Sequence, residues 1–139
     1  IGKEKVGLRI SPFSYADTHE NEEDLLQLYT LLASKLNDCH LSYLHLSHMG
    51  EAVGVKFELW NTIRKIHQRN LMLCGDFTKK SAEKALQNGD ADLIAFGRDY
   101  IANPDLVERF RNNWPLAERD RTNWYTQGAK GLIDYPKYE

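Results

Sequence analysis

The chain alternates between short apolar stretches and longer amphipathic ones. Four stretches of strand length are rich in apolar residues: 5–11, 41–47, 71–75 and 91–97. Each is followed by a segment in which apolar residues recur at three- and four-residue intervals, the spacing of one helix face. The pattern therefore predicts the order β-α-β-α-β-α-β-α. Such an order implies an α/β fold with a parallel sheet and right-handed crossovers.

Residues at the predicted helix ends agree with this order. Asn21 precedes three acidic residues and is placed to cap the first helix at the positive end of its dipole. Thr78 and Gly89 are suited to begin and end the third helix. Asn103 and Pro104 predict the start of the fourth, as N-cap and first-turn residue.

Two architectures fit the alternation: a small doubly wound sheet and one half of a (β/α)₈ barrel. A doubly wound dinucleotide-binding sheet carries a glycine-rich motif after its first strand, and "RISPFSYAD" (9–17) contains no glycine. The pattern alone leaves the choice open.

The composition limits the kinds of partner that the chain can bind. The chain has 139 residues and a formal net charge of −2, with acidic and basic residues interspersed, so its charge gives no general attraction to nucleic acid. No apolar run is long enough to cross a membrane. Cys39 and Cys74 show no metal or redox spacing, and His45 and His48 point to opposite faces of a strand, so no metal site is expected. These features favour a protein of the reducing cytoplasm.

The last two predicted strands end in similar motifs, "CGDFT" (74–78) and "FGRDY" (96–100). Glycine lets a ligand approach the backbone closely, and Arg98 offers a fork of donors to phosphate oxygens. In barrels, the loops after strands seven and eight typically bind phosphate. Equally, the glycines could form tight turns while Arg98 pairs with Asp99 or Asp92.

Arg9 interrupts the first apolar strand. Alternation places it on the same face as Gly7 and Ser11. An unpaired charge on an inner face is costly, so Arg9 requires an anion, an electron-rich ligand or a structural salt bridge.

Taken in order, these motifs resemble the old yellow enzymes, FMN-dependent NAD(P)H:flavin oxidoreductases. The four apolar stretches are similar to the family's barrel strands five to eight, and "LAERDRTNWYTQGAKGLIDYP" (116–136) is similar to its closing segment. The resemblance covers essentially the whole chain. It implies the C-terminal half of a (β/α)₈ TIM barrel, with 1–139 as a single partial domain and 114–139 as its closing segment.

The resemblance also implies a site. Arg9 would contact the pyrimidine side of FMN, and Tyr125 would line the substrate side. The backbones of the two glycine turns would hold the phosphate. The residues implied in cofactor binding are Arg9, Gly75, Asp76, Phe77, Gly97, Arg98 and Trp124. The sequence departs from the family at Asp76, usually a small or amide residue, and at His48, commonly an acidic one.

The implied reaction carries hydride from NAD(P)H through FMN to an α,β-unsaturated carbonyl compound. The family's substrate-anchoring histidine pair and tyrosine proton donor belong to the first half of the barrel, and no segment here matches them. No catalytic residue is therefore assigned, and whether the chain alone is an enzyme stays open.

A half barrel leaves two strand edges that must be paired or covered. We therefore expect either a chain carrying the missing N-terminal half or a second copy as partner. The alternative is a non-catalytic half barrel that self-associates and at most binds a phosphate ligand.

Overall fold

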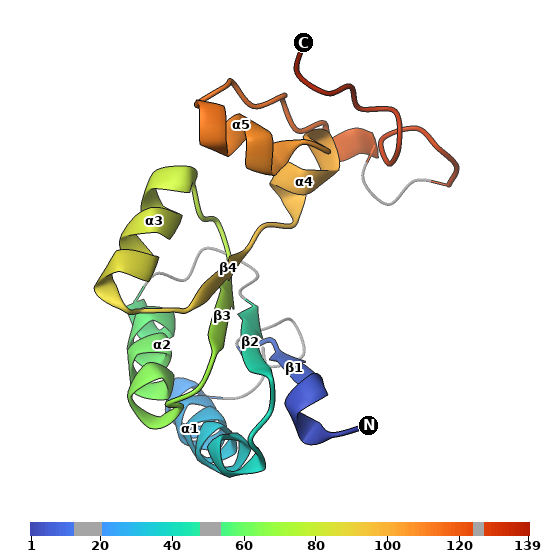
Figure 1. The fold of residues 1–139 in the computed structure, drawn as a ribbon. Helices are drawn as coiled ribbons and strands as arrows, with labels where there is room; N and C mark the ends of the chain where they lie inside the picture. The colour runs from blue at the N-terminus through green and yellow to red at the C-terminus, as the bar shows by residue number, and fades with distance from the viewer. Residues whose placement is uncertain (13–20, 48–53, 124–126) are drawn as a thin grey trace. The chain divides into compact units, whose positions relative to one another are not determined.

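The computed structural model describes residues 1–12, 21–47, 54–123 and 127–139. Contacts divide the chain into two compact units, Ile1–Ala95 and Phe96–Glu139. The first unit contains strands β1 (Gly7–Ile10), β2 (Tyr43–Ser47), β3 (Leu71–Cys74) and β4 (Leu93–Ala95). They form one sheet in that order, and each neighbouring pair is parallel (Figure 1). The four predicted strands are confirmed, each shorter than its apolar stretch.

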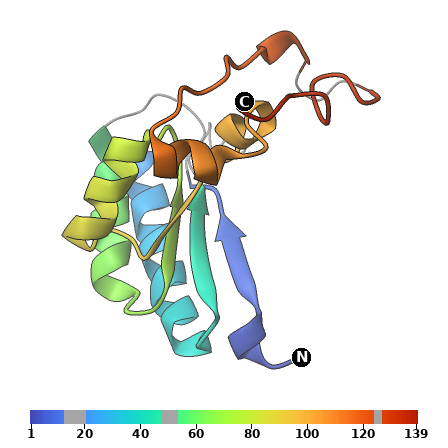
Figure 2. The same cartoon turned by 45° about the horizontal axis from the view of Figure 1, so that its top comes forward.

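Three helices pack on one face of this sheet: α1 (Glu22–Cys39), α2 (Gly54–Ile66) and α3 (Lys79–Asn88), as Figures 1 and 2 both show. The core between the two layers joins buried residues of β2 and β3 to residues of α1 and α2. It includes Ala33, Leu36, Leu44, Leu46, Leu59, Ile63, Leu71 and Leu73.

The opposite face of the sheet carries a different set of side chains. Because successive strand residues point to opposite faces, the leucines of β2 and β3 that enter the core leave the intervening residues on this second face. No α-helix in the described part of the first unit covers that face (Figure 2). We call it the open face. Its residues are Gly7, Arg9, Tyr43, His45, Ser47, Met72, Cys74, Leu93 and Ala95.

The helix ends follow the sequence signals closely. The side chain of Asn21 accepts a hydrogen bond from the backbone N–H of Asp24 at 2.8 Å and so caps α1. Thr78 and Ser81 form a reciprocal capping box at the start of α3. Gly89 ends that helix with φ 78°, in the left-handed region that glycine adopts without strain. These three of the predicted caps are confirmed.

The second unit contains helices α4 (Arg98–Ala102) and α5 (Leu106–Asn112). Short 3₁₀ turns lie at Lys3–Lys5 in the first unit and at Arg121–Asn123 in the second. The prediction that Asn103 caps the last helix is wrong, because Asn103 instead follows α4 and Asp105 stands at the N-cap of α5. Asn103 is fully buried, and its side chain is occupied elsewhere: it donates to the carbonyl of Asp99 and accepts from the N–H of Ala117.

Candidate functional site

The carboxyl ends of the four parallel strands meet at one edge of the sheet. Ligands of α/β proteins bind outside this edge, because the loops and helix N-termini that follow the strands converge there. In this chain the edge is approached by Arg9 on β1, by Ser47 at the end of β2, and by the turn that begins at Gly75 after β3.

Arg9 is held on the open face by Ser47. Its Cα is paired in register with that of His45, but its guanidinium reaches forward, and Nη2 donates to Oγ of Ser47 at 2.6 Å. Arg9 is exposed, whereas Ser47 is only 2% exposed. Among the described residues no carboxylate forms an ion pair with Arg9. The structural salt bridge considered for Arg9 is therefore not found in this part of the chain, and a neutral hydroxyl is its partner.

His45 lies beside Arg9 on the same face. Its Nε2 is buried and has no hydrogen-bond partner among the residues that the structure describes. Burial, together with the positive charge of Arg9, lowers the pKa of His45 below its ordinary value of 6.5. The imidazole is therefore neutral at physiological pH, and Arg9 is the cationic member of this pair.

The turn from β3 to α3 brings Gly75, Asp76 and Phe77 together at the carboxyl edge. Phe77 stacks on Trp60 of α2, with ring centroids 6.3 Å apart and planes inclined by 14°, and it packs against the core. This contact anchors the turn to the helical layer. Asp76 is exposed and Gly75 is half-buried. The capping box of α3 then orders the backbone that follows.

Gly97 and Arg98 belong to the second unit. Gly97 is the N-cap of α4 with φ −101°, a conformation open to any residue, and a Cβ built there would meet nothing within 4 Å. Backbone strain therefore does not require glycine, and the space beside its backbone is open. Of the pairings considered for Arg98, Asp92 instead pairs with Arg64 at 2.7 Å, and Asp99 contacts Arg119 at 3.5 Å. Because the two units are described separately, the joint use of Gly75 and Gly97 in one phosphate site stays a prediction.

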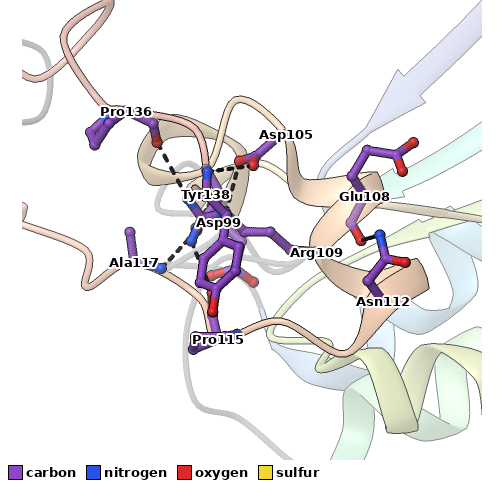
Figure 3. A network of polar contacts seen from close by, with 10 residues as sticks. Asp99, Asp105, Glu108, Arg109, Asn112, Pro115, Ala117, Pro136 and Tyr138 are labelled. Carbon is purple, nitrogen blue, oxygen red and sulfur yellow. Dashed lines mark hydrogen bonds and ion pairs between the residues drawn. The ribbon is translucent and has the colours of Figure 1, made fainter.

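A buried polar network in the second unit was not anticipated from the sequence (Figure 3). Arg109 is 5% exposed, and its Nε donates to Oδ1 of Asp105 at 2.7 Å. Nη1 donates to the carbonyl of Pro115 at 2.9 Å, and Nη2 to that of Pro136 at 3.3 Å. The Tyr138 ring lies under the guanidinium, 5.5 Å from its centre. The i,i+4 spacing of Asp105 and Arg109 was the available signal, but it is common on exposed helices.

This network ties both ends of the closing segment to α5. Asp105 accepts from the N–H of Tyr138 at 2.8 Å, and that hydrogen bond is the largest cause of the lowered pKa of its carboxyl. Asn103 holds Ala117 nearer the start of the segment at 2.7 Å. The segment between these attachments carries Trp124 and Tyr125, which lie outside the described residues, as does His48.

Among the described residues, no group of three or more His, Cys, Asp or Glu residues could hold a metal ion. None of the described helices combines the length and apolar character needed to cross a membrane.

Comparison with known proteins places these features in a family. Residues 1–117 match the family model described as the NADH:flavin oxidoreductase / NADH oxidase family. The chain belongs to this family. It is 36% identical over 140 residues to a 12-oxophytodienoate reductase-like protein of Solanum lycopersicum, covering 100% of this chain and 38% of that protein. The family expected from the strand motifs is confirmed.

Solved structures of the same family share the fold. The old yellow enzyme of Trypanosoma cruzi superposes with a TM-score of 0.88 at 32% identity, over 100% of this chain and 37% of that one. Morphinone reductase in complex with tetrahydroNAD gives a TM-score of 0.82 at 32% identity, over 99% and 37%. The four parallel strands thus match old yellow enzyme TIM barrels, and the expected partial barrel is confirmed. The chain spans less than two fifths of the length of these relatives.

The described residues fit an FMN ligand at two points and oppose it at one. Arg9 presents a charge that no described carboxylate neutralises, which suits the electron-rich pyrimidine side of a flavin. The open space beside Gly97 would let a phosphate approach the backbone. The carboxylate of Asp76 is exposed, and unless it is paired or turns away it would oppose a phosphate bound at its own turn. On balance the residues fit the cofactor, with Asp76 weakening its hold.

Proposed function

We propose that this chain is the FMN-binding part of an NAD(P)H-dependent flavin oxidoreductase that reduces α,β-unsaturated carbonyl compounds. The observation that carries the proposal is the guanidinium of Arg9, held by Ser47 on the open face of a sheet of this family. The relatives named as 12-oxophytodienoate reductases, and the morphinone reductase structure with tetrahydroNAD, support a nicotinamide-linked reductase.

The residues of this chain would bind and orient the cofactor. Arg9 would donate to the pyrimidine side of the flavin. Gly75, Asp76, Gly97 and Arg98 would hold the phosphate through backbone N–H groups and the Arg98 side chain, with Phe77 anchoring the first turn. Trp124 would lie near the dimethylbenzene edge, and Tyr125 would line the substrate side. When bound, FMN supplies the hydride-transfer chemistry between NAD(P)H and the substrate β-carbon.

The proposed enzyme requires a partner. Among the described residues, no strand pairs with the outer edges of β1 and β4, and the open face bears Leu93, which is 44% exposed. We propose that a polypeptide carrying the first four βα units completes the barrel. A second copy is less suited, because two open faces brought together would bury two Arg9 guanidinium groups in one interior without a described counter-charge.

The test compares FMN with riboflavin, which lacks the phosphate. Titration of the purified chain, followed by quenching of flavin fluorescence, should give one bound FMN per chain and weaker riboflavin binding. Arg9→Met should weaken both flavins about equally, because it removes a contact to the ring. Arg111→Met is the matched control, since Arg111 is exposed and pairs with Glu108 on α5. Absence of FMN binding by the chain, with or without a complementing N-terminal half, would contradict the proposal.

A second candidate function follows from the open face itself. A non-catalytic half barrel would associate through that face and its edges and at most bind a phosphate ligand. Native mass spectrometry separates the two functions. A colourless dimer whose mass and composition do not change with FMN supports the half-barrel scaffold, whereas a flavin-loaded species supports the reductase.

A further inference from the structure

Ser47 occupies an unusual position for a hydroxyl. It is the last residue of β2 and is 2% exposed, and its Oγ accepts the hydrogen bond from Arg9 at 2.6 Å. Arg9 is paired in register not with Ser47 but with His45, two residues earlier on β2. The guanidinium therefore leans along the sheet by about two residue rises, roughly 6–7 Å, toward the carboxyl edge.

We propose that Ser47 is a positioning residue that aims the Arg9 guanidinium at the ligand edge of the sheet while leaving its charge intact. An arginine on a strand has several rotatable bonds, and ordering it costs conformational entropy. The short hydrogen bond to a buried hydroxyl holds one end of the side chain in place. The guanidinium of Arg9 therefore has its orientation before a ligand binds.

The chemistry of the partner matters as much as its position. A carboxylate at this place would form a charge-assisted pair with Arg9 and cancel its field. The serine hydroxyl accepts a hydrogen bond but carries no charge. The neighbouring His45 is kept neutral by its burial and by Arg9, so it adds no second cation. Among the described residues, Arg9 is thus the one positive charge on the open face, and its hydrogen bond to Ser47 gives that charge a direction.

This arrangement gives Ser47 a role in the proposed function, on which the following consequence rests. A fixed cation beside the flavin ring, which no described carboxylate compensates, would favour the more negative, reduced state over the oxidised one. Ser47 would therefore raise the affinity for reduced FMN relative to oxidised FMN. It would have little effect on phosphate binding, which the proposed function assigns to other residues.

The first test needs no flavin. The ¹⁵N heteronuclear NOE of the Arg9 Nε–H group reports whether the side chain is ordered. It should be high in the wild-type chain and in Ser47→Thr, which keeps the hydroxyl and suits a strand. It should fall in Ser47→Ala and stay at the wild-type value in Ser34→Ala, since Ser34 is exposed on α1. An Arg9 side chain that is equally ordered in Ser47→Ala would overturn the positioning role.

The second test measures the affinities for oxidised and reduced FMN in the same variants. Ser47→Ala should lower the ratio of reduced to oxidised affinity by about tenfold, which for a two-electron couple corresponds to a potential about 30 mV more negative. Ser47→Asp should keep Arg9 ordered and yet lower the ratio at least as far, because the carboxylate neutralises it. The comparison of the two variants separates the effect of Arg9 order from the effect of Arg9 charge. If Ser47 had only a structural role, the ratio of affinities would stay unchanged.

The two tests also separate this inference from the proposed function. If the wild-type chain binds FMN but Ser47→Ala and Ser47→Asp keep the wild-type ratio, the role of Ser47 is wrong and the flavin function stands. If the wild-type chain binds no FMN either alone or together with a complementing N-terminal half, the proposed function fails, and the Arg9 order measurement still decides whether Ser47 positions the guanidinium.

Discussion

We expect His67 to make the folded state less stable at acidic pH. The residue follows the last turn of α2 and is fully buried, at 0% exposure, and neither ring nitrogen has a hydrogen-bond partner among the described residues. Burial, and then the positive charge of Arg64, lowers the pKa of His67 below 6.5, and the nearby backbone of Asn70, too poorly placed for a full hydrogen bond, only partly opposes this. The folded state therefore holds this imidazole neutral at a pH where the unfolded chain already binds a proton.

The sign and size of the effect follow from proton linkage. Below pH 6.5 the unfolded state binds more protons than the folded state, so the free energy of unfolding falls as the pH falls, until the lowered folded-state pKa is reached. One histidine contributes a slope of at most about 1.4 kcal/mol per pH unit. His45, whose pKa is also lowered, contributes with the same sign. His67→Leu should remove one of these two contributions.

The assay is urea unfolding followed by far-UV circular dichroism, from about pH 7.5 down to about pH 5, where the carboxylates with lowered pKa values stay ionised. The wild-type free energy of unfolding should decline below pH 6.5, and His67→Leu should show a visibly shallower decline. Ser34→Ala is the control, because it changes an exposed residue that does not titrate and should therefore retain the wild-type slope. An unchanged slope in His67→Leu would refute the reasoning.

Three further predictions concern the candidate site and the closing segment. Asp76→Asn should tighten FMN binding about threefold to tenfold and leave riboflavin binding unchanged, because it removes a negative charge beside the phosphate; equal effects on both flavins would contradict this in the same fluorescence titration. Gly97→Val should change the melting temperature by no more than about 2 °C, since a Cβ there meets nothing within 4 Å. Isothermal titration should nevertheless show that it weakens the binding of FMN more than the binding of riboflavin. Arg109→Met should free the segment held at Pro115 and Pro136, so limited proteolysis should release C-terminal fragments at least several-fold faster than in Arg111→Met, and equal rates would contradict the clamp.

Local signals in the sequence determined the elements of this protein. The four apolar stretches became the four strands, because an alternating pattern of apolar runs and helical periodicity has few other ways to bury its hydrophobic surface. Capping involves groups within three or four residues, so a residue's own chemistry is enough to predict it. The helix caps at Asn21, Thr78 and Gly89 therefore lie where the sequence placed them. The same local logic was wrong at Asn103, because its side chain instead bonds the carbonyl of Asp99 in the preceding turn and the N–H of Ala117 in the closing segment.

Contacts between distant residues were decided only by the tertiary structure. The sequence singled out Arg9 as a charge in need of a partner, but the partner, Ser47, lies 38 residues away and is set by the register of β1 against β2. A shift of one residue would turn Ser47 to the helical face and leave Arg9 without it. The burial of His67 likewise depends on which surfaces meet when the chain folds, and so does the packing of the closing segment around Arg109. Spacing along a sequence reports the period of a helix or strand, and the packing of one element against another then selects which polar groups lose water and which partners they find.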